Sequence, residues 1–187
     1  MNNMKNKKIL IGVTGGIAAY KTCSLVNMFL KEGADVKVIM TNGATKFITP
    51  LTFQSLTNHP VYVDMWQTYN KEEVEHISLA KWADIMVISP ATANIIGKIA
   101  HGLADDLLTT VVMALPKETL VLIAPAMNTN MWENPITQKN AEILAGYKKY
   151  KFLETRKGVL ACRDEGSGKI ADNEDILEEA KKILAKK

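Results

Sequence analysis

The stretch "KKILIGVTGGIAAYK", residues 7–21, decides the fold class of this 187-residue chain. Its first half, Lys7–Val13, is a nearly continuous apolar run with the length of a buried strand. Gly15 and Gly16 follow at once, and apolar residues with helical spacing continue to Gly33, a residue type that commonly ends helices. A strand that is apolar on both faces and leads through a glycine turn into a helix is typical of a parallel sheet covered by helices.

The same alternation of strand and helix patterns continues along the chain. Further apolar runs of strand length lie at 35–40, 83–89 and 118–124, and weaker ones lie at 59–64 and 149–154. Segments with helical spacing separate or follow them, at 16–33, 74–82, 94–103, 105–115, 134–147 and 173–187, where Asn173 is the expected N-cap. We therefore predict one doubly wound α/β domain over residues 1–187, with a parallel sheet and helices on both faces. We also predict a disordered tail at 1–6 and a loop at 156–172 that closes over a site.

Composition and charge narrow the classes of partner. The net charge of +3 is spread along the chain without a dense basic block, so nucleic acid is not an expected partner. The apolar run near the N-terminus is too short for a signal peptide, and no apolar stretch is long enough to cross a bilayer. Two cysteines far apart, Cys23 and Cys162, indicate neither a disulfide framework nor a metal site. We expect a cytoplasmic protein with no membrane partner.

The glycine turn after the first strand is a candidate phosphate site. In doubly wound sheets ligands bind beyond the carboxyl ends of the strands, and a glycine turn opening a helix points backbone N–H groups outward. The spacing Gly12, Gly15, Gly16 lacks the dinucleotide pattern, and the second strand ends in Met40 and Thr41 instead of an acidic residue. A nicotinamide dinucleotide is therefore disfavoured, and a mononucleotide with one phosphate is favoured. The alternative is that the glycines only let helix and strand pack closely.

Polar residues also follow the strand at 83–89. Ser89, Thr92 and Asn94 offer hydroxyl and amide groups where the next helix begins, more than one helix cap needs. They are expected beside the glycine turn. Asp105 and Asp106 fall in the first turn of a further predicted helix, where a favourable helix dipole explains them without a catalytic role.

The segment "APAMNTNMWENP", residues 124–135, places large apolar side chains in a loop between two prolines. They either pack beneath the loop or line a pocket or a subunit interface. Asn128 can present both a donor and an acceptor to a bound amide or carboxylate. His76, at the start of the predicted helix 74–82, is either a surface residue or a base, because its ordinary pKa is near neutral.

The segment "GVLACRDEGSGK", residues 158–169, places the Cys162 thiol in a glycine-rich polar run. Such a run is typical of a surface loop, which is a poor place for a buried cysteine. From this segment alone, the thiol is either an apolar anchor for the loop or a functional group.

These stretches together resemble the homo-oligomeric flavin-containing cysteine decarboxylase family. The matching pieces occur in the family's order over almost the whole chain, and they are "GGIAAYK", "MTNGATKFITPLTF", "HISLAKWADIMVISPATAN", "GLADDLL", "PAMNTNMW" and "ACRDEGSGK". The resemblance implies a flavodoxin-like or Rossmann-like subunit that binds FMN. It also implies a homotrimer, or four trimers joined as a dodecamer, with active sites between subunits.

The resemblance assigns roles to particular residues. His76 and Cys162 match the catalytic residues, and Asn128 matches the substrate-binding asparagine. Met131 and Lys169 are further expected substrate contacts, with Lys169 or Arg163 a candidate for the substrate's phosphate. The expected FMN contacts are Gly15, Gly16, Ile17, Ala18, Thr41, Phe47, Ser89, Ala91, Thr92, Ala93 and Asn94.

The reaction implied is the FMN-dependent decarboxylation of 4′-phosphopantothenoylcysteine to 4′-phosphopantetheine and CO2 in coenzyme A synthesis. Simple loss of CO2 would leave an unstabilised carbanion. Transient oxidation to a thioaldehyde provides an electron sink, and the enethiolate that follows is then reduced and protonated, with Cys162 as the expected acid. The alternatives are an oxidative peptidyl-cysteine decarboxylase, which stops at the enethiol, and a non-catalytic flavin-binding regulatory subunit. "PAMNTNMW" argues against a flavin prenyltransferase.

Many bacterial relatives carry this domain fused to the synthetase that makes the substrate. No such domain follows Lys187, so we expect either a free-standing decarboxylase, with the synthetase as a separate partner, or a fragment of a longer chain.

Overall fold

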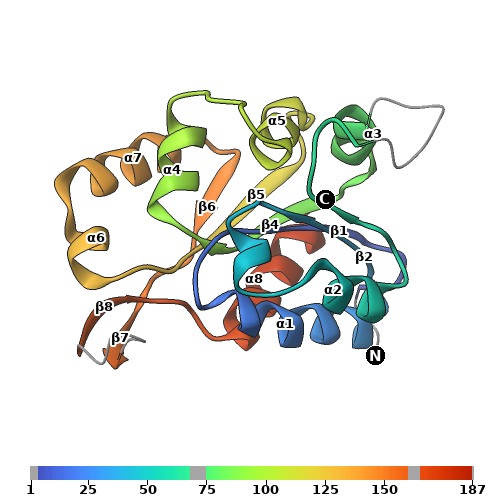
Figure 1. Cartoon of the computed structure of the whole chain (residues 1–187), viewed down its shortest axis with the longest axis horizontal. Coiled ribbons are helices and arrows are strands. Elements are labelled where there is room, and N and C mark those ends of the chain that lie inside the picture. Colours follow the sequence, from blue (N-terminus) through green and yellow to red (C-terminus); the bar gives the residue numbers. More distant parts are fainter. Residues whose placement is uncertain (1–3, 68–74, 160–164, 187) are drawn as a thin grey trace.

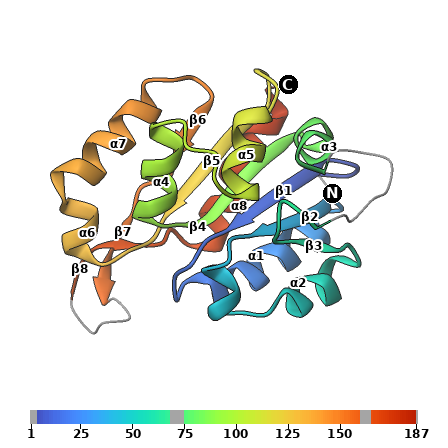
Figure 2. The same ribbon diagram turned by 45° about the horizontal axis from the view of Figure 1, so that its top comes forward.

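The computed structural model describes residues 4–67, 75–159 and 165–186, which form a parallel sheet between two layers of helices (Figures 1 and 2). The strands of the main sheet are β1 (Lys8–Val13), β2 (Asp35–Met40), β3 (Val61–Tyr62), β4 (Ile85–Ala91), β5 (Leu120–Pro125) and β6 (Tyr150–Phe152). The helices are α1 (Ala19–Lys31), α2 (Pro50–Thr57), α3 (Glu75–Trp82), α4 (Ala93–Ala100), α5 (Leu107–Ala114), α6 (Thr129–Glu133), α7 (Pro135–Ala145) and α8 (Asn173–Ala185), with a 3-10 turn η1 (Ala44–Lys46). The predicted doubly wound α/β architecture is confirmed.

The order of the strands places a crevice at one edge of the sheet. The order is β3-β2-β1-β4-β5-β6, and every neighbouring pair is parallel. The chain therefore winds outward in one direction from β1 and in the other direction from β4. Between these two strands the loops that leave their carboxyl ends diverge, and this is where open α/β sheets bind ligands.

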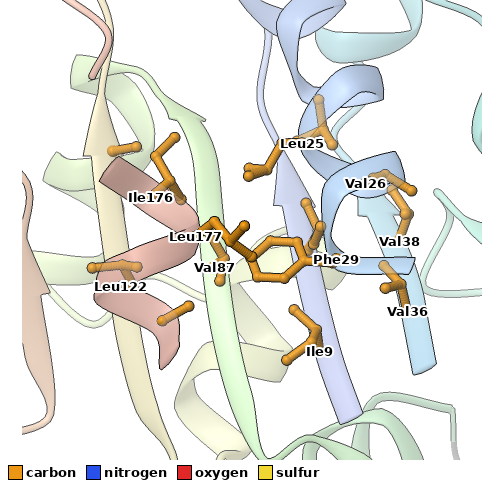
Figure 3. Close-up of a cluster of buried hydrophobic side chains, with 14 of the residues drawn as sticks. Ile9, Leu25, Val26, Phe29, Val36, Val38, Val87, Leu122, Ile176 and Leu177 are labelled. Atoms are coloured by element: carbon orange, nitrogen blue, oxygen red, sulfur yellow. The ribbon is translucent and has the colours of Figure 1, made fainter. Parts of the chain in front are cut away.

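Alternating side chains of the strands form two cores, one on each face of the sheet. Ile9, Ile11 and Val13 of β1 pack in the core under α1, α2 and α8, whereas Leu10 packs under α3, α4 and α5. Figure 3 shows the first core, in which Phe29 of α1 lies beside Leu177 of α8 and near Val87 of β4. Burial of such a large apolar side chain contributes roughly 1.5–3 kcal/mol, so these layers hold the strand ends in fixed positions.

The ends of α1 and α8 differ slightly from the predicted ones. Gly33 follows α1 with φ of 84°, the left-handed conformation that favours glycine after a helix. Residues 16–18 form a turn before α1 instead of its first helical residues. Asn173, the predicted N-cap of α8, is its first helical residue, and Asp172 occupies the cap position. The Asn173 side chain instead donates from Nδ2 to the carbonyl of Lys21, at 3.0 Å.

Two segments are more ordered than the sequence predicts. Met4, in the predicted tail, is buried in the core because it packs beside α1 and β2, and its N–H donates to the carbonyl of Glu32. The predicted loop at 156–172 contains the antiparallel strands β7 (Arg156–Val159) and β8 (Glu165–Lys169). The sequence pattern missed this hairpin because β8 is glycine-rich and has no alternation of apolar and polar side chains.

Within the described residues, no helix has both the length and the apolar character needed to cross a membrane. The same residues contain no cluster of side chains suited to hold a metal ion.

Candidate functional site

The turn between β1 and α1 approaches a second glycine very closely. A Cβ on Gly15 would lie 2.9 Å from the carbonyl carbon of Gly43, in the loop after β2. The turn is held by the Gly16 N–H, which donates to the carbonyl of Thr14 at 3.0 Å. The backbone N–H groups of Ile17 and Ala18 donate no hydrogen bond within the described chain. Unpaired N–H groups just before a helix form a cradle for an anion.

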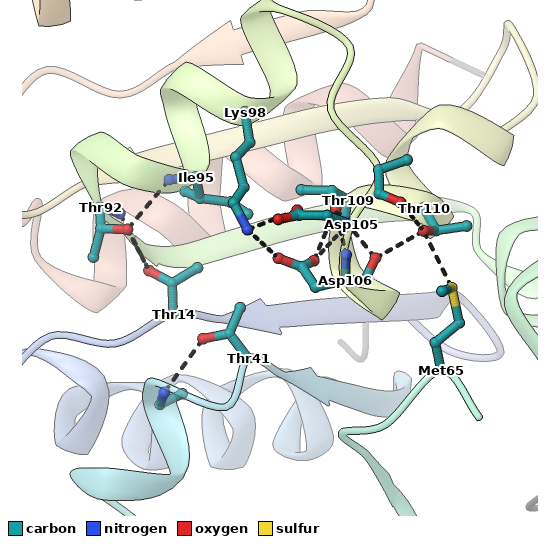
Figure 4. Close-up of polar contacts among 12 residues, drawn as sticks. Thr14, Thr41, Met65, Thr92, Ile95, Lys98, Asp105, Asp106, Thr109 and Thr110 are labelled. Atoms are coloured by element: carbon teal, nitrogen blue, oxygen red, sulfur yellow. Dashed lines mark hydrogen bonds and ion pairs between the residues drawn. The ribbon is translucent and has the colours of Figure 1, made fainter. Parts of the chain in front are cut away.

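Hydroxyl groups tie this turn to the loop after β4 (Figure 4). The Thr14 hydroxyl donates to the carbonyl of Pro90 at 2.7 Å and accepts from the N–H of Thr92 at 3.2 Å. Thr92 in turn caps α4, because its hydroxyl accepts from the Ile95 N–H at 3.4 Å. The two loops at the switch in strand order therefore have fixed relative positions.

The third side of the site comes from β8 lying against the segment after β5. The Met127 N–H donates to the carbonyl of Gly168 at 3.0 Å, and the Thr129 hydroxyl donates to the carbonyl of Ser167 at 2.8 Å. The Ser167 hydroxyl donates to Glu133 at 2.6 Å. Gly168 has φ of 104°, and a Cβ there would lie 2.5 Å from the Met127 carbonyl oxygen. Only glycine permits this close approach.

These three segments enclose a cavity of about 610 Å³, a volume suited to a cofactor or a small substrate. Its lining residues are Gly15, Gly16, Ile17, Ala18, Tyr20, Lys21, Thr92, Ala126, Met127, Asn128, Met131, Val159, Gly168, Lys169 and Ile170. Among these described residues there are two lysines and no carboxylate. The cavity therefore favours anionic ligands.

Eight of the residues proposed from the sequence line this one cavity. They are Gly15, Gly16, Ile17, Ala18, Thr92, Asn128, Met131 and Lys169. They come from four distant parts of the chain, and the fold brings them together.

Other proposed cofactor residues lie close behind the lining or at its edge. Ser89 and Ala91 are fully buried in β4, and the Ser89 side-chain oxygen has no hydrogen-bond partner. The Thr41 hydroxyl accepts from the Ala44 N–H at 3.2 Å, in the loop that contacts Gly15. Three further residues are absent from the lining of the described chain: Phe47 is half-exposed after η1, and Ala93 and Asn94 begin α4.

The two residues proposed to be catalytic are not brought to the cavity by the described chain. His76 is half-buried on α3, and Figures 1 and 2 both place α3 at the opposite end of the molecule from α6 and the β7–β8 hairpin. Cys162 lies outside the described residues, as does Arg163. The roles of both catalytic residues stay predictions.

Sequence reasoning missed several lining residues, chiefly Tyr20, Lys21 and Val159. Tyr20 and Lys21 lie three and four positions after Ile17, a spacing that puts side chains on one helix face. That spacing is the signal that would have found them. Val159 is an exposed residue of β7 and has no comparable spacing signal.

Asn128 has a structural contact as well as its position in the cavity. Its Oδ1 accepts from the N–H of Asn130 at 2.9 Å, which caps the short helix α6. The cap fixes the side chain at the cavity surface. A carboxamide held this way can recognise a carboxylate or an amide of a bound molecule.

Asp105 and Asp106 do not act through the helix dipole alone, as the sequence suggested. Asp106 is the N-cap of α5 in a capping box with Thr109, and its Oδ1 accepts from the Thr109 N–H at 2.8 Å. Lys98 of α4 contacts Asp105 at 2.7 Å and Asp106 at 2.9 Å (Figure 4). The hydrogen bond from Lys98 lowers the pKa of the Asp105 carboxyl. The contribution of this contact to stability is therefore present above the ordinary carboxyl pKa and is lost as the pH falls through the lowered one.

We expect Asp106→Ala to lower the free energy of unfolding by about 1–2 kcal/mol, because the helix loses its cap. Asp106→Asn keeps a side-chain oxygen for the Thr109 N–H and should lose less. Asp105→Ala, at a position 64% exposed, should change stability little. Urea denaturation of the three variants measures these differences. Equal losses for Asp106→Asn and Asp106→Ala would assign the effect to the charge instead of the cap.

Comparison with known proteins identifies the class of this fold and cavity. The model of the Flavoprotein family matches residues 1–185. The chain therefore belongs to the Flavoprotein family, and its cofactor is a flavin.

Two curated relatives are similar over nearly the whole chain. The "Coenzyme A biosynthesis bifunctional protein CoaBC" of Bacillus subtilis is 44% identical over 97% of this chain and 44% of its own length. The "Probable phosphopantothenoylcysteine decarboxylase" of Streptococcus mutans is 46% identical over 95% of this chain and 99% of its own length. The chain thus spans less than half of the bifunctional relative and almost all of the shorter one.

Solved structures share the fold at full length. A PPC decarboxylase mutant complexed with pantothenoylaminoethenethiol is 33% identical with a TM-score of 0.86, over 97% of this chain and 100% of that one. "The FMN binding protein AtHal3" is 32% identical with a TM-score of 0.83, over 98% and 99%. The FMN-dependent cysteine decarboxylase SpaF is 32% identical with a TM-score of 0.82, over 96% and 97%.

Proposed function

We propose that this protein is an FMN-dependent decarboxylase that converts 4′-phosphopantothenoylcysteine into 4′-phosphopantetheine and CO2 in coenzyme A synthesis. The observation that carries the proposal is the single cavity at the β1–β4 crevice, in which the glycine turn and Asn128 face one ligand space that lacks carboxylates. The names of both curated relatives and of the solved PPC decarboxylase agree with this activity.

The residues present fit FMN as the particular flavin. The unpaired N–H groups of Ile17 and Ala18 at the start of α1 suit a single phosphate. The Gly15–Gly43 contact leaves this cradle open, because neither residue carries a side chain. The buried Ser89 hydroxyl without a partner lies in the strand behind the same crevice. Two of the similar solved structures are described as binding or depending on FMN.

The proposed reaction gives distinct roles to Asn128, His76 and Cys162. Bound FMN would supply the two-electron chemistry that makes loss of CO2 from a cysteinyl group accessible. Asn128, fixed by its cap to Asn130, holds the substrate's carboxylate or amide and orients the reacting carbon. His76 acts as a base or orienting group. Cys162 donates the proton that completes the saturated product.

We further propose that the active sites form between copies of the chain in a homotrimer or a dodecamer. Within one chain His76 lies on α3, which both views place at the opposite end of the molecule from α6 and the β7–β8 hairpin, and a second copy would supply it to the site (Figures 1 and 2). Ile77 beside it and Met113 on α5 are large apolar side chains exposed on the same helical layer, as at an interface.

The compartment that suits a free thiol such as Cys23 is the reducing cytoplasm. The fused synthetase of the bifunctional relatives suggests a separate synthetase chain as a partner.

The product formed from 4′-phosphopantothenoylcysteine tests the function. We expect flavin-loaded protein to give a product that has lost CO2 alone, which mass spectrometry distinguishes from loss of CO2 and two hydrogens. The second result would identify an oxidative decarboxylase, whose substrate is expected to be a peptidyl cysteine. The pantothenoylaminoethenethiol bound to the PPC decarboxylase mutant is, by its name, an unsaturated thiol of that oxidised kind.

We expect Cys162→Ser to release CO2 but to accumulate the unsaturated thiol, because the acid that completes the product is gone. Cys23→Ser is the matched control. Cys23 is half-buried on α1 against the first core, and burial raises the pKa of its thiol, so it is poorly suited to donate a proton. Full turnover to the saturated product by Cys162→Ser would remove Cys162 from this role.

A further inference from the structure

The proposed substrate carries two anionic groups at opposite ends, a carboxylate on the cysteinyl end and a phosphate on the other. The glycine turn accounts for the phosphate of FMN, and Asn128 accounts for the cysteinyl end. Nothing in these assignments binds the substrate's own phosphate. The two lysines that line the cavity, Lys21 and Lys169, are the cations available for it among the described residues.

Lys21 lies one helical turn beyond the glycine turn. It follows Tyr20 on α1 and lies four positions after Ile17 of the preceding turn, and all three residues line the cavity. Its backbone position is fixed from the C-terminal part of the chain, because Nδ2 of Asn173 donates to the Lys21 carbonyl at 3.0 Å. Asn173 is the first residue of α8, which packs against α1.

Lys169 approaches the same cavity from the other side. It ends β8, directly after Gly168, whose carbonyl accepts from the Met127 N–H. The Lys169 side chain crosses the hairpin over Gly158, which carries no side chain of its own. The Lys169 ammonium nitrogen lies 3.5 Å from the position that a Cβ on Gly158 would take. The two lysines thus come from elements on different sides of one cavity.

Both ammonium groups lack an ion-pair partner in the part of the chain that the structure describes. Five other cations of the described residues do have one, namely Lys98, Lys151, Arg156, Lys181 and Lys182. The cavity lining contains no carboxylate either. Two unneutralised cations facing a concave, carboxylate-free surface attract a doubly charged anion and form charge-assisted hydrogen bonds with it.

Resting on the proposed function, we propose that Lys21 and Lys169 together bind the phosphate of the substrate and make the site selective for phosphorylated over unphosphorylated substrate. The substrate then extends from the two lysines at its phosphate end to Asn128 at its cysteinyl end. Of the two lysines, only Lys169 was predicted from the sequence, as a substrate contact and, like Arg163, as a candidate for the substrate's phosphate. The pairing with Lys21 follows from the fold.

The test compares 4′-phosphopantothenoylcysteine with pantothenoylcysteine, which differs only by the phosphate. Lys21→Met and Lys169→Met keep the aliphatic stem and remove the charge. Each is expected to raise KM for the phosphorylated substrate by roughly 10- to 100-fold, the range for a lost charge-assisted hydrogen bond. The rise in KM should be smaller for pantothenoylcysteine, which has no phosphate for either lysine to bind. Lys31→Met is the matched control, because Lys31 is exposed at the far end of the same helix.

Several outcomes would overturn the proposal. Equal rises in KM for both substrates would make the lysines structural, and a wild-type enzyme that does not discriminate would show that the site ignores the phosphate. A Lys21→Met protein that loses FMN affinity but keeps the discrimination would assign Lys21 to the cofactor.

Binding measurements keep this inference separate from the proposed function. Calorimetric titration of flavin-loaded protein with 4′-phosphopantetheine and pantetheine gives the phosphate preference without turnover. If neither substrate is decarboxylated, the proposed function fails. The titration still tests whether the two lysines bind the phosphate. A phosphate preference that is present in the wild type and lost in both variants supports the role of the two lysines. A preference that is absent in the wild type, or unchanged in the variants, overturns it.

Discussion

Gly15→Ala should yield a folded protein that binds FMN roughly 10- to 100-fold more weakly and is correspondingly inactive without added cofactor. The new methyl carbon would lie 2.9 Å from the carbonyl carbon of Gly43 and 3.0 Å from its Cα. Carbon atoms not bonded to each other attract best at about 3.5–4.0 Å, so the two loops have to separate. Forced repacking of this kind costs about 1–3 kcal/mol, and both contacting atoms belong to backbone that cannot rotate away.

Flavin absorbance of the purified protein and titration with FMN measure this effect, and circular dichroism shows whether the fold survives. Gly146→Ala is the matched control. Gly146 is exposed after α7 with a helical backbone conformation, and the nearest atom to an added Cβ is 3.4 Å away. Full flavin content in Gly15→Ala would show that the Gly15–Gly43 contact does not shape the cofactor site.

Asn128→Asp should raise KM for 4′-phosphopantothenoylcysteine by roughly 30- to 1,000-fold while leaving FMN binding and folding intact. An aspartate retains the side-chain oxygen that accepts from the Asn130 N–H, so the cap of α6 is preserved. It adds a negative charge at the position proposed to hold the substrate carboxylate. Like charges about 4 Å apart repel by up to roughly 4 kcal/mol at the effective dielectric constant of a protein surface.

Asn130→Asp is the control for this charge. It adds the same charge two residues along, at an exposed position outside the cavity lining. The expected KM for Asn130→Asp is therefore near that of the wild type. An unchanged KM in Asn128→Asp, or an equal rise in both variants, would count against a contact between Asn128 and the substrate carboxylate.

The sheet and the N-terminal side of the cavity were predictable because their signals are local. The apolar runs of β1, β2, β4 and β5 are buried on both faces, and that burial leaves a continuous pattern in the sequence. The glycine turn directly follows β1 and precedes a helix. The sequence therefore places it at the carboxyl end of that strand, where ligands bind in such sheets.

The C-terminal side of the cavity was not predictable in the same way. The strand β8, "EGSGK", forms because Gly166 and Gly168 carry no side chains and can lie against Thr129 and Met127. This packing depends on a contact with a distant segment, so it leaves no periodic pattern in the sequence. Lys21 was likewise missed, because a lysine on an amphipathic helix resembles an ordinary surface residue until Lys169, 148 positions later, is placed beside the same cavity. The separation of His76 from the cavity in one chain depends on where α3 packs on the sheet, which the local pattern does not determine.

The bond between Asn173 and the carbonyl of Lys21 joins residues 152 positions apart. It has a consequence for synthesis of the protein on the ribosome. The glycine turn leaves the exit tunnel long before β8 and the start of α8, the elements that complete the cavity. Domains generally fold as units during translation, so a nascent chain has no complete ligand cavity until β8 has been made. Cofactor loading is therefore expected only after β8 has left the tunnel, and a product that ends before β8 should be left without flavin and exposed to proteolysis.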